Sequence, residues 1–345
     1  MLAAVFQSKN EIRLEQRPVP SIREDEMLVQ IEVCGLCGTD IAKIEQQSVS
    51  PGTILGHEIS GIIVKIGEKV TRFQLGDHVY VAHHVPCFTC DQCRKGRFSL
   101  CPQYKETNVE PGGFAQYIRV SAQHIQHTVG HIDSLTFEEG AFVEPIACSL
   151  YGLRKIQIDA GDDVLILGAG QIGLIFLQLI QMRFPKNIIV ADKNEFRLQQ
   201  ATQFGASGVI NIFYTDLVTE VHEATNGIGV ETVIICAGVK ELLPLAISCL
   251  KRGGTVLVFA PFSNELLAID SSVFFQDEIK VIGSYSSSPY DYPLAKQLIA
   301  KKIVDVDKMI THRFGLAQLL EAVQCAKNPE ATSVKVVIHP QFRSV

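Results

Sequence analysis

The sequence predicts an α/β protein of two domains, because two stretches of the chain differ in their hydrophobic pattern. Residues 1–150 hold short apolar segments broken by Gly, Pro and Asp, which is typical of irregular β structure. The middle of the chain instead alternates short apolar runs with longer segments of helical character. That alternation predicts a parallel sheet covered by helices on both faces. A length of 345 residues also exceeds one ordinary hydrophobic core and favours two domains.

Each predicted element rests on one of these runs. The β-rich part includes strands at Met27–Val33 and Ile59–Ile66. Segments of helical character, such as Asn194–Phe204 and Glu241–Leu250, separate the predicted strands of the middle part. Those strands, which match a doubly wound dinucleotide-binding fold, are Val164–Leu167, Ile188–Ala191, Val209–Ile212, Val233–Cys236, Val256–Phe259 and Val281–Gly283. After a turn-rich break, the chain continues with two helices and a strand, predicted at Leu294–Lys301, Leu316–Ala326 and Val334–Ile338.

Composition and charge argue against several classes of protein. The formal net charge is −6 and no block of Lys or Arg is present, which disfavours nucleic acid or an anionic membrane as a partner. The chain reaches Lys9 and Glu11 before a signal-peptide apolar region develops. The apolar run around Ile172–Ile180 is too short to span a bilayer. We therefore expect a cytoplasmic protein whose ten cysteines are reduced.

Four cysteines lie within 15 residues, as Cys87-x2-Cys90-x2-Cys93-x7-Cys101. Short gaps on a turn-forming chain allow four thiolates to surround one Zn²⁺ at about 2.3 Å. The cluster contains no histidine and leaves no ligand position open. We therefore expect it to hold the loop in shape and to activate nothing, so that any chemistry lies elsewhere.

A glycine-rich turn follows the predicted strand Val164–Leu167 and leads into an apolar helix; it reads Gly168-Ala169-Gly170-Gln171-Ile172-Gly173. A strand before and a helix after distinguish it from a chance GxGxxG. The glycines allow a tight turn, close approach to a pyrophosphate and close helix–strand packing, and the helix N-terminus attracts phosphate. Asp192, 19 residues beyond Gly173, is placed to accept hydrogen bonds from an adenosine ribose, which favours NAD over NADP. Lys193 and Arg197 weaken that preference, because nearby cations offset the carboxylate.

Two further segments carry metal-ligand side chains, Cys34-Gly35-Leu36-Cys37-Gly38-Thr39-Asp40 and Gly56-His57-Glu58. Read alone, Cys34-x2-Cys37 is compatible with a redox dithiol or with half of a second zinc cluster. We disfavour both interpretations, because Cys34 continues a strand pattern whereas Cys37 lies in the glycine turn after it. The two sulfurs then need not point the same way.

Taken together, these motifs resemble the zinc-containing medium-chain alcohol dehydrogenase family over essentially the whole chain. The family carries, in order, GxCGxD, GHE, a four-cysteine structural-zinc loop and a Rossmann fingerprint; here they read GLCGTD, GHE, the Cys87–Cys101 loop and GAGQIG. The resemblance implies a GroES-like catalytic domain formed by residues 1–152 and 285–345. A doubly wound Rossmann domain, residues 153–284, would be inserted between these parts. It further implies an NAD-linked oxidoreductase with one catalytic and one structural zinc ion per chain.

The resemblance also assigns roles to individual residues. Cys37 and His57 match the family's catalytic zinc ligands, and Glu144 matches the glutamate found in the polyol dehydrogenases, such as sorbitol dehydrogenase, and in the threonine dehydrogenases. Whether Glu58, Glu144 or both reach the metal stays open at this stage. The zinc ion would acidify an alcohol, whose carbon then gives a hydride to the nicotinamide. Thr39 matches the Ser/Thr that takes the alcohol proton.

One position departs from several relatives, and it bears on the proton path. Ala42 stands where they have a histidine that ends a proton path to solvent, so we expect a pH profile without a titrating relay histidine.

The resemblance implies secondary hydroxyls of polyols, sugar alcohols or cyclitols as substrates, in a polar pocket near Gln46, Gln47 and Asn108. An L-threonine 3-dehydrogenase-like activity, a sugar-alcohol-phosphate dehydrogenase and a catalytically inactive dinucleotide-binding relative are the alternatives. Relatives form homodimers or homotetramers, and the apolar strand at Val281–Gly283 fits a paired edge.

Overall fold

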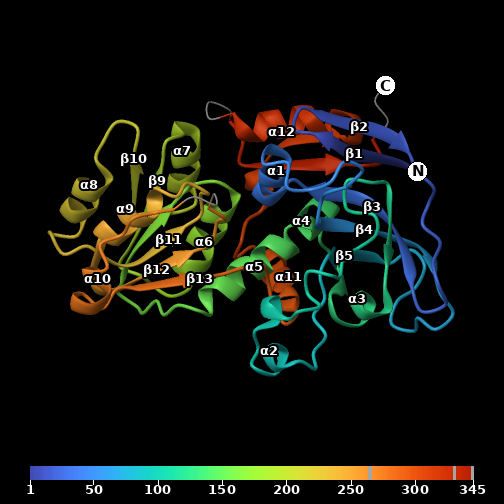
Figure 1. The fold of residues 1–345 in the computed structure, drawn as a ribbon, viewed down its shortest axis with the longest axis horizontal. Coiled ribbons are helices and arrows are strands. Elements are labelled where there is room, and N and C mark those ends of the chain that lie inside the picture. The colour runs from blue at the N-terminus through green and yellow to red at the C-terminus, as the bar shows by residue number, and fades with distance from the viewer. Residues whose placement is uncertain (263–265, 329–331, 343–345) are drawn as a thin grey trace. The chain divides into compact units, whose positions relative to one another are not determined.

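The computed structural model describes residues 1–262, 266–328 and 332–342, and the chain divides into two compact units (Figure 1). Unit 1 comprises Met1–Ala147 together with Ser287–Val345, and unit 2 is Cys148–Ser286. The end of the chain therefore returns to the unit in which it began, and the expected insertion of one domain into another is confirmed. The domain boundaries expected from the sequence, after residues 152 and 284, stay a prediction. No helix in the described part of the chain is long and apolar enough to span a membrane.

Unit 1 is built on a seven-stranded sheet with the order β14-β15-β3-β4-β5-β7, and β6 pairs with β3 beside this path. Near one end of β3, Gly35 lies opposite Val337 of β15 in antiparallel pairing. A strand from the tail thus lies beside the strand that leads into the Cys37 segment. The strands of this sheet are β3 (Met27–Gly35), β4 (Glu58–Ile66), β5 (His78–Ala82), β6 (Tyr117–Val120), β7 (Val129–His131), β14 (Ile310–Gly315) and β15 (Lys335–His339); β1 (Leu2–Ser8) and β2 (Glu11–Gln16) form a separate antiparallel pair.

The helices of unit 1 are short. The one that matters most for the site is α1 (Gly38–Glu45), which begins directly after Cys37. Cys37 caps this helix, because its Sγ accepts a hydrogen bond from the Thr39 backbone N–H at 3.4 Å. Asp40 completes the capping box by accepting from the Cys37 N–H at 3.2 Å. The other helices are α2 (Asp91–Arg94), α3 (Ala122–His127), α4 (Phe137–Ala141), α11 (Tyr292–Ala300) and α12 (Leu319–Lys327), with α5 (Val143–Leu153) at the boundary of the units and 3₁₀ turns at Phe98–Leu100, Asp307–Met309 and Leu316–Gln318.

Ion pairs connect the tail of the chain to α4 within unit 1. The Arg313 guanidinium donates two hydrogen bonds of 2.7 Å to Glu138, and the Lys302 ammonium donates one of 2.7 Å to Glu139. Lys302 is half-exposed, with 53% of its side chain accessible to solvent, whereas the Glu139 side chain is largely buried at 7%. These contacts join segments more than 160 residues apart in sequence.

Unit 2 is a six-stranded, fully parallel sheet with the order β10-β9-β8-β11-β12-β13. Counted from β8, this is the order 3-2-1-4-5-6 of a doubly wound dinucleotide-binding fold. The six strands predicted from apolar runs are thereby confirmed as β8 (Asp163–Leu167), β9 (Asn187–Asp192), β10 (Gly208–Asn211), β11 (Val230–Ile235), β12 (Leu250–Val258) and β13 (Lys280–Gly283). The helices of this unit are α6 (Gln171–Gln181), α7 (Glu195–Gln203), α8 (Leu217–Ala224), α9 (Leu242–Ser248) and α10 (Ser272–Gln276).

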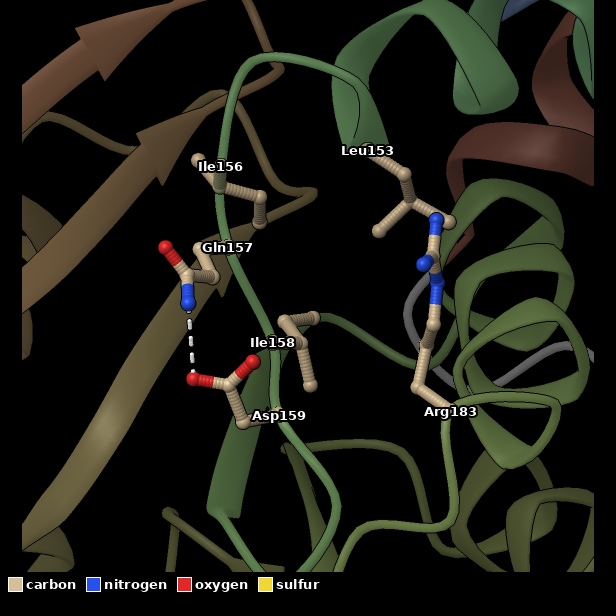
Figure 2. A pocket seen from close by; sticks show the side chains of 6 residues that line it. All are labelled: Leu153, Ile156, Gln157, Ile158, Asp159 and Arg183. Carbon is tan, nitrogen blue, oxygen red and sulfur yellow. Dashed lines mark hydrogen bonds between the residues drawn. The ribbon is translucent and has the colours of Figure 1, made fainter.

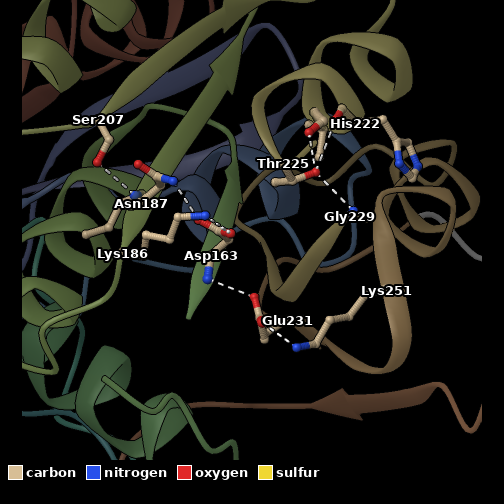
Figure 3. A network of polar contacts seen from close by, with 11 residues as sticks. Asp163, Lys186, Asn187, Ser207, His222, Thr225, Gly229, Glu231 and Lys251 are labelled. Atoms are coloured by element: carbon tan, nitrogen blue, oxygen red, sulfur yellow. Dashed lines mark hydrogen bonds and ion pairs between the residues drawn. The ribbon is translucent and has the colours of Figure 1, made fainter. Parts of the chain in front are cut away.

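The amino ends of the central strands in unit 2 are held by a polar network (Figure 3). Asp163 accepts hydrogen bonds from Asn187 at 2.6 Å and from Lys186 at 3.3 Å, which connects the starts of β8 and β9. The Asp163 backbone N–H donates to Glu231 at 2.7 Å, and Glu231 pairs with Lys251 of β12. This edge is therefore occupied by groups that satisfy one another. The opposite, carboxyl edge is where the glycine-rich turn lies.

Candidate functional site

The four cysteines predicted to hold a structural metal converge in the structure. The sulfur atoms of Cys87, Cys90, Cys93 and Cys101 all lie within 4.8 Å of one another, and none forms a disulfide. The Cys93 sulfur lies 4.0 Å from that of Cys87 and 3.5 Å from that of Cys90. Four sulfurs placed at about 2.3 Å from one tetrahedral ion are ~3.8 Å apart. The donor set therefore fits a zinc ion.

The thiols of this loop differ in how readily they ionise. A hydrogen bond from the Thr89 hydroxyl, together with backbone N–H groups, lowers the pKa of Cys87 to about 6. Burial and the neighbouring thiols raise the pKa of Cys93 to about 12. Four thiolates crowded together repel one another, so a divalent cation is needed to keep all of them ionised. The loop is thus suited to permanent occupation by a metal.

Cys37, His57 and Glu58 form the second cluster, in which one ligand atom of each residue lies within 4.8 Å of the others. Cys37 is the N-cap of α1, His57 directly precedes β4, and Glu58 is the first residue of β4. His57 is 9% exposed and Glu58 is fully buried. Sulfur, imidazole nitrogen and carboxylate oxygen are ligands that zinc prefers, and three protein donors leave one tetrahedral position for another molecule. This donor set fits a catalytic zinc ion.

Asp40 connects the first two members of this cluster, here called the Cys37–His57–Glu58 cluster. Its Oδ1 lies 3.2 Å from His57 Nδ1 and accepts the Gly56 N–H at 3.3 Å, while its other oxygen accepts the Cys37 N–H. With Nδ1 engaged, Nε2 of His57 is the nitrogen that remains for a metal. Burial favours the neutral carboxyl, yet His57 and Lys43 outweigh it and lower the pKa of Asp40. Burial likewise opposes a charged His57, yet Asp40 and Cys37 raise the pKa of its imidazole well above 6.5. The cluster favours a positive charge.

A buried ion pair that no sequence motif had indicated adjoins this cluster. The Lys335 ammonium donates a hydrogen bond to Glu58 Oε2, and both side chains are 0% exposed. Lys335 is the first residue of β15. The signal in the sequence was a single lysine inside the apolar strand predicted at Val334–Ile338. A lysine there needs a buried carboxylate partner.

The remaining predicted catalytic residues take different positions. Glu144 lies in the first turn of α5 and is 8% exposed, but among the described residues it is not part of the Cys37–His57–Glu58 cluster. Thr39 follows Cys37 by two residues, and its side chain is partly exposed. Ala42 lies three residues further along α1. Gln46 and Gln47, expected near the substrate, are exposed after the end of this helix, as is Asn108 in its own loop.

Two histidines that the sequence analysis did not consider lie beside the same cluster. The ring centroid of His83 lies 4.7 Å from that of His57 and 3.9 Å from that of His84. His84 lies 5.1 Å from the ring of Tyr104, which packs into the small hydrophobic cluster of the four-cysteine loop. Burial lowers the pKa of His84 to about 4, so this ring is neutral at pH 7. The adjacent pair of histidines just before Cys87 was the signal in the sequence.

The glycine-rich turn has the geometry that its sequence predicts. Gly168, directly after β8, has φ +107°, a conformation that favours glycine. A Cβ on Gly173 would lie 1.9 Å from the Gly168 carbonyl oxygen, so helix α6 approaches the turn more closely than any side chain permits. A Cβ on Gly170, the N-cap of α6, would meet nothing within 4 Å. The backbone is therefore open at the helix N-terminus, where a phosphate group binds favourably.

Asp192 lies at the end of β9, next to this turn. Its Oδ2 accepts the Ala169 N–H at 2.7 Å, and its Oδ1 accepts the Asn194 N–H at 2.9 Å. Each carboxylate oxygen has a second lone pair, so both oxygens keep the capacity to accept a ribose hydroxyl. Lys193 is exposed, and Arg197 lies in the first turn of α7. The structure thus brings the acid to the glycine turn, as the predicted cofactor site requires.

A small pocket in unit 2 lies apart from these residues (Figure 2). Two of its polar side chains satisfy each other, because Gln157 Nε2 donates to Asp159 Oδ2 at 2.8 Å. The lining is Leu153, Ile156, Gln157, Ile158, Asp159 and Arg183. None of these residues belongs to a predicted metal or cofactor site. We therefore place the candidate function at the two clusters and the glycine-rich turn.

Comparison with known proteins also indicates a zinc-binding dehydrogenase. The family "Alcohol dehydrogenase GroES-like domain" matches residues 23–129, and the family "Zinc-binding dehydrogenase" matches residues 171–301. Sorbitol dehydrogenase of Bacillus subtilis (strain 168) is 31% identical, with 99% of this chain and 97% of that protein covered. D-arabitol-phosphate dehydrogenase of Enterococcus avium is also 31% identical, with coverages of 93% and 91%.

A solved structure agrees in fold over the whole chain. It is that of a protein from Sinorhizobium meliloti 1021 described as a zinc-binding dehydrogenase, bound to NADP. Its TM-score is 0.88 at 30% identity, and the match covers 98% of this chain and 99% of that one. The family resemblance inferred from the four ordered motifs is therefore confirmed. This chain belongs to the zinc-binding alcohol dehydrogenase family, and within it to the polyol dehydrogenase subgroup.

Proposed function

We propose that this protein is an NAD-dependent zinc polyol dehydrogenase, which oxidises a secondary hydroxyl of a polyol, sugar alcohol or cyclitol to a ketone. The observation that carries the proposal is the convergence of Cys37, His57 and Glu58 within 4.8 Å. The names of its relatives, sorbitol dehydrogenase and D-arabitol-phosphate dehydrogenase, support the substrate class. The inactive dinucleotide-binding alternative has no support, because every donor of the cluster is present.

In this proposal, Cys37, His57 and Glu58 hold the catalytic zinc ion and the four cysteines of the loop hold the structural one. Glu144 stays a proposed additional ligand or water-bridged neighbour. When bound, the catalytic zinc supplies Lewis acidity that lowers the pKa of an alcohol hydroxyl. Asp40 orients His57 through Nδ1, as a carboxylate behind a metal-binding imidazole does.

Proton transfer in the proposed reaction starts at Thr39. Its hydroxyl accepts the alcohol proton and passes it to water or to cofactor ribose hydroxyls. Ala42 offers no titratable group for a further step, so the relay ends without a histidine on α1. Ala42 also lowers the odds of an L-threonine 3-dehydrogenase-like activity, which remains the alternative from the sequence.

The cofactor in this proposal binds at the turn Gly168–Gly173, with its pyrophosphate at the N-terminus of α6. Gln171 and Ile172 contribute backbone N–H groups of the first helical turn. A nicotinamide held here would supply the hydride acceptor. Asp192 supports NAD rather than NADP, because a 2′-phosphate would meet its carboxylate. The exposed Lys193 and nearby Arg197 keep NADP as the less favoured alternative.

A phosphorylated polyol is a second candidate substrate. One observation favours it, namely that D-arabitol-phosphate dehydrogenase is as similar to this chain, at 31% identity, as sorbitol dehydrogenase is. Substrate pairs with and without phosphate therefore belong in the test.

A homodimer or homotetramer in the cytoplasm completes the proposal. Its support is the edge strand β13, on which Val281 is 38% exposed, since an apolar sheet edge invites pairing. Light scattering on a sizing column measures the assembly, and a monomer would remove this part of the proposal.

The test of the proposed function combines zinc analysis with NADH formation on polyols, cyclitols, polyol phosphates, threonine and simple alcohols. We expect both a structural and a catalytic zinc ion per chain, with turnover on a polyol or cyclitol. One zinc ion per chain, with no NADH from any substrate, would leave the cysteine loop intact and overturn the catalytic assignment.

A further inference from the structure

The buried ion pair beside the Cys37–His57–Glu58 cluster joins two distant parts of the sequence. Glu58 and Lys335 are 277 residues apart, and neither side chain is exposed to solvent. Removing two charges from water is costly, so a buried pair is a weak means of stabilising a fold. Because this pair lies next to a cluster of metal-ligand atoms, its position indicates a role in that cluster.

The position of the Lys335 ammonium is fixed from several sides. Besides Glu58, it donates a hydrogen bond to the Leu36 carbonyl oxygen at 3.3 Å, and it lies 5.6 Å from the centroid of the Phe142 ring. The backbone of Gly35 passes so close that a Cβ there would lie 2.7 Å from Nζ and 1.9 Å from Glu58 Oε2. The absence of a side chain at Gly35 makes room for the pair.

The two oxygens of Glu58 are in different situations. Oε2 accepts the hydrogen bond from Lys335, whereas Oε1 is buried and makes no hydrogen bond with any described residue. A buried carboxylate oxygen without a partner is rare, because its desolvation is uncompensated. Glu58 itself has one ligand atom within 4.8 Å of those of Cys37 and His57. A cation held by this cluster would supply the missing partner.

We propose that Lys335 is a positioning residue, which engages Oε2 of Glu58 and thereby directs Oε1 alone to the catalytic metal. The inference rests on the proposed function, because it presupposes a metal at the Cys37–His57–Glu58 cluster. It adds that Glu58 contributes a single oxygen and that a residue of the C-terminal strand β15 sets this geometry. Without the ammonium, both oxygens of Glu58 become available to the metal, and the number of ligands increases.

Cobalt substitution tests this inference through a readout other than activity. Co²⁺ replaces zinc in the full chain, and its visible absorption is strong at four ligands and weaker at five or six. The His57→Ala protein supplies the contribution of the four-cysteine loop, which is subtracted. In Lys335→Met we expect the remaining absorption to weaken by about twofold or more, as the site expands beyond four ligands. Lys302→Met removes a lysine from a carboxylate pair away from the cluster and is expected to leave the spectrum unchanged.

A double variant separates positioning from simple charge. In Glu58→Gln/Lys335→Met no second carboxylate oxygen is present, so we expect its cobalt spectrum to equal that of Glu58→Gln alone. The inference is overturned if Lys335→Met keeps the wild-type spectrum, or if the Lys335→Met change persists undiminished in the Glu58→Gln background.

Folding and the proposed function have their own controls. If Lys335→Met does not fold, Lys335→Gln is shorter, polar and uncharged, so it also removes the ammonium from Glu58 Oε2. We expect the same weakening, and an unchanged spectrum would again overturn the inference. If wild-type protein shows no cobalt absorption beyond that of the loop, the catalytic metal site itself fails, and with it the proposed function.

Discussion

The two candidate metal centres of this protein are built in opposite ways. The four-cysteine loop draws all its donors from 15 consecutive residues, and Cys87 and Cys90 remain partly exposed. The Cys37–His57–Glu58 cluster draws donors from α1 and β4 and receives support from Lys335 in the last strand. A loop that folds around its own ion needs only local spacing. A site that must keep one position open needs the rigidity of a sheet and of buried partners.

The largest expected effect is on catalysis at the buried cluster. We expect His57→Ala to lower kcat/KM by at least about a thousandfold, or ~4 kcal/mol, because a three-donor site loses one donor. Steady-state kinetics and zinc analysis on the same sample measure the effect. His131→Ala, at a partly exposed histidine away from the cluster, is the matched control and should retain activity. Near-wild-type turnover in His57→Ala would place the chemistry elsewhere.

The loop should show the reverse pattern, with a large effect on stability and little on chemistry. We expect Cys93→Ser to lose the structural zinc ion and several kcal/mol of unfolding free energy, because metal binding energy is folding energy. Thermal denaturation and turnover per folded molecule at low temperature separate the two effects. Cys325→Ser, outside both clusters, is the control. An unchanged melting temperature and zinc content would contradict a structural metal.

A smaller effect is expected from the residue that orients the buried cluster. Asp40→Asn keeps the shape of the side chain but removes its charge, which weakens the hold on His57 Nδ1. We expect a loss of about 10- to 100-fold in activity or in metal affinity. Competition with a chelator measures the affinity, and Asp91→Asn in the loop helix α2 is the control. Equal zinc affinities of Asp40→Asn and wild type, with unchanged kcat/KM, would show that His57 needs no such partner.

The smallest effect concerns a partly exposed ion pair, which serves as the contrast to Glu58–Lys335. Burial opposes ionisation of Glu139, but Lys302 and Thr136 outweigh it and lower the pKa of this carboxyl. A lowered pKa means that the pair stabilises the fold above the unfolded glutamate value, ~4.3, and that this contribution is lost as the pH falls through the folded value.

We therefore expect Lys302→Met to lose only about 0.5 kcal/mol of unfolding free energy near pH 7, because Lys302 is half-exposed. The difference from wild type should vanish at acidic pH, which urea denaturation across the pH range measures. A difference that grew as the pH fell would reverse the assigned sign. Lys302→Gln, of similar polarity, controls for the loss of a polar side chain.

The sequence was informative wherever one short segment carries the whole feature. The spacing of Cys87–Cys101 predicted a cluster of four sulfurs, and the structure brings them within 4.8 Å of one another. The strand–turn–helix around Gly168 predicted the open glycine turn in the same way, and the alternation of apolar runs with helical segments predicted the sheet of unit 2. The roles of these residues in binding metal and cofactor stay predictions.

The sequence left open which distant side chains contact one another. It left Glu58 and Glu144 as equal candidates, whereas the structure groups only Glu58 with Cys37 and His57 among the described residues. It also gave no partner for the buried Lys335 and did not place His83 beside His57.

By itself, the sequence therefore determined the family, the order of the two kinds of domain, the local cysteine loop and the glycine turn. The loop and the turn depend on residue spacing along a short stretch of chain, and the family and the domain order follow from the order of such motifs along the chain. Only the tertiary structure decided which acid joins the buried cluster, and that Lys335 of the last strand neutralises it. The pairing of β15 with β3 brings residues 277 positions apart into contact, and no local pattern encodes which buried charges will meet.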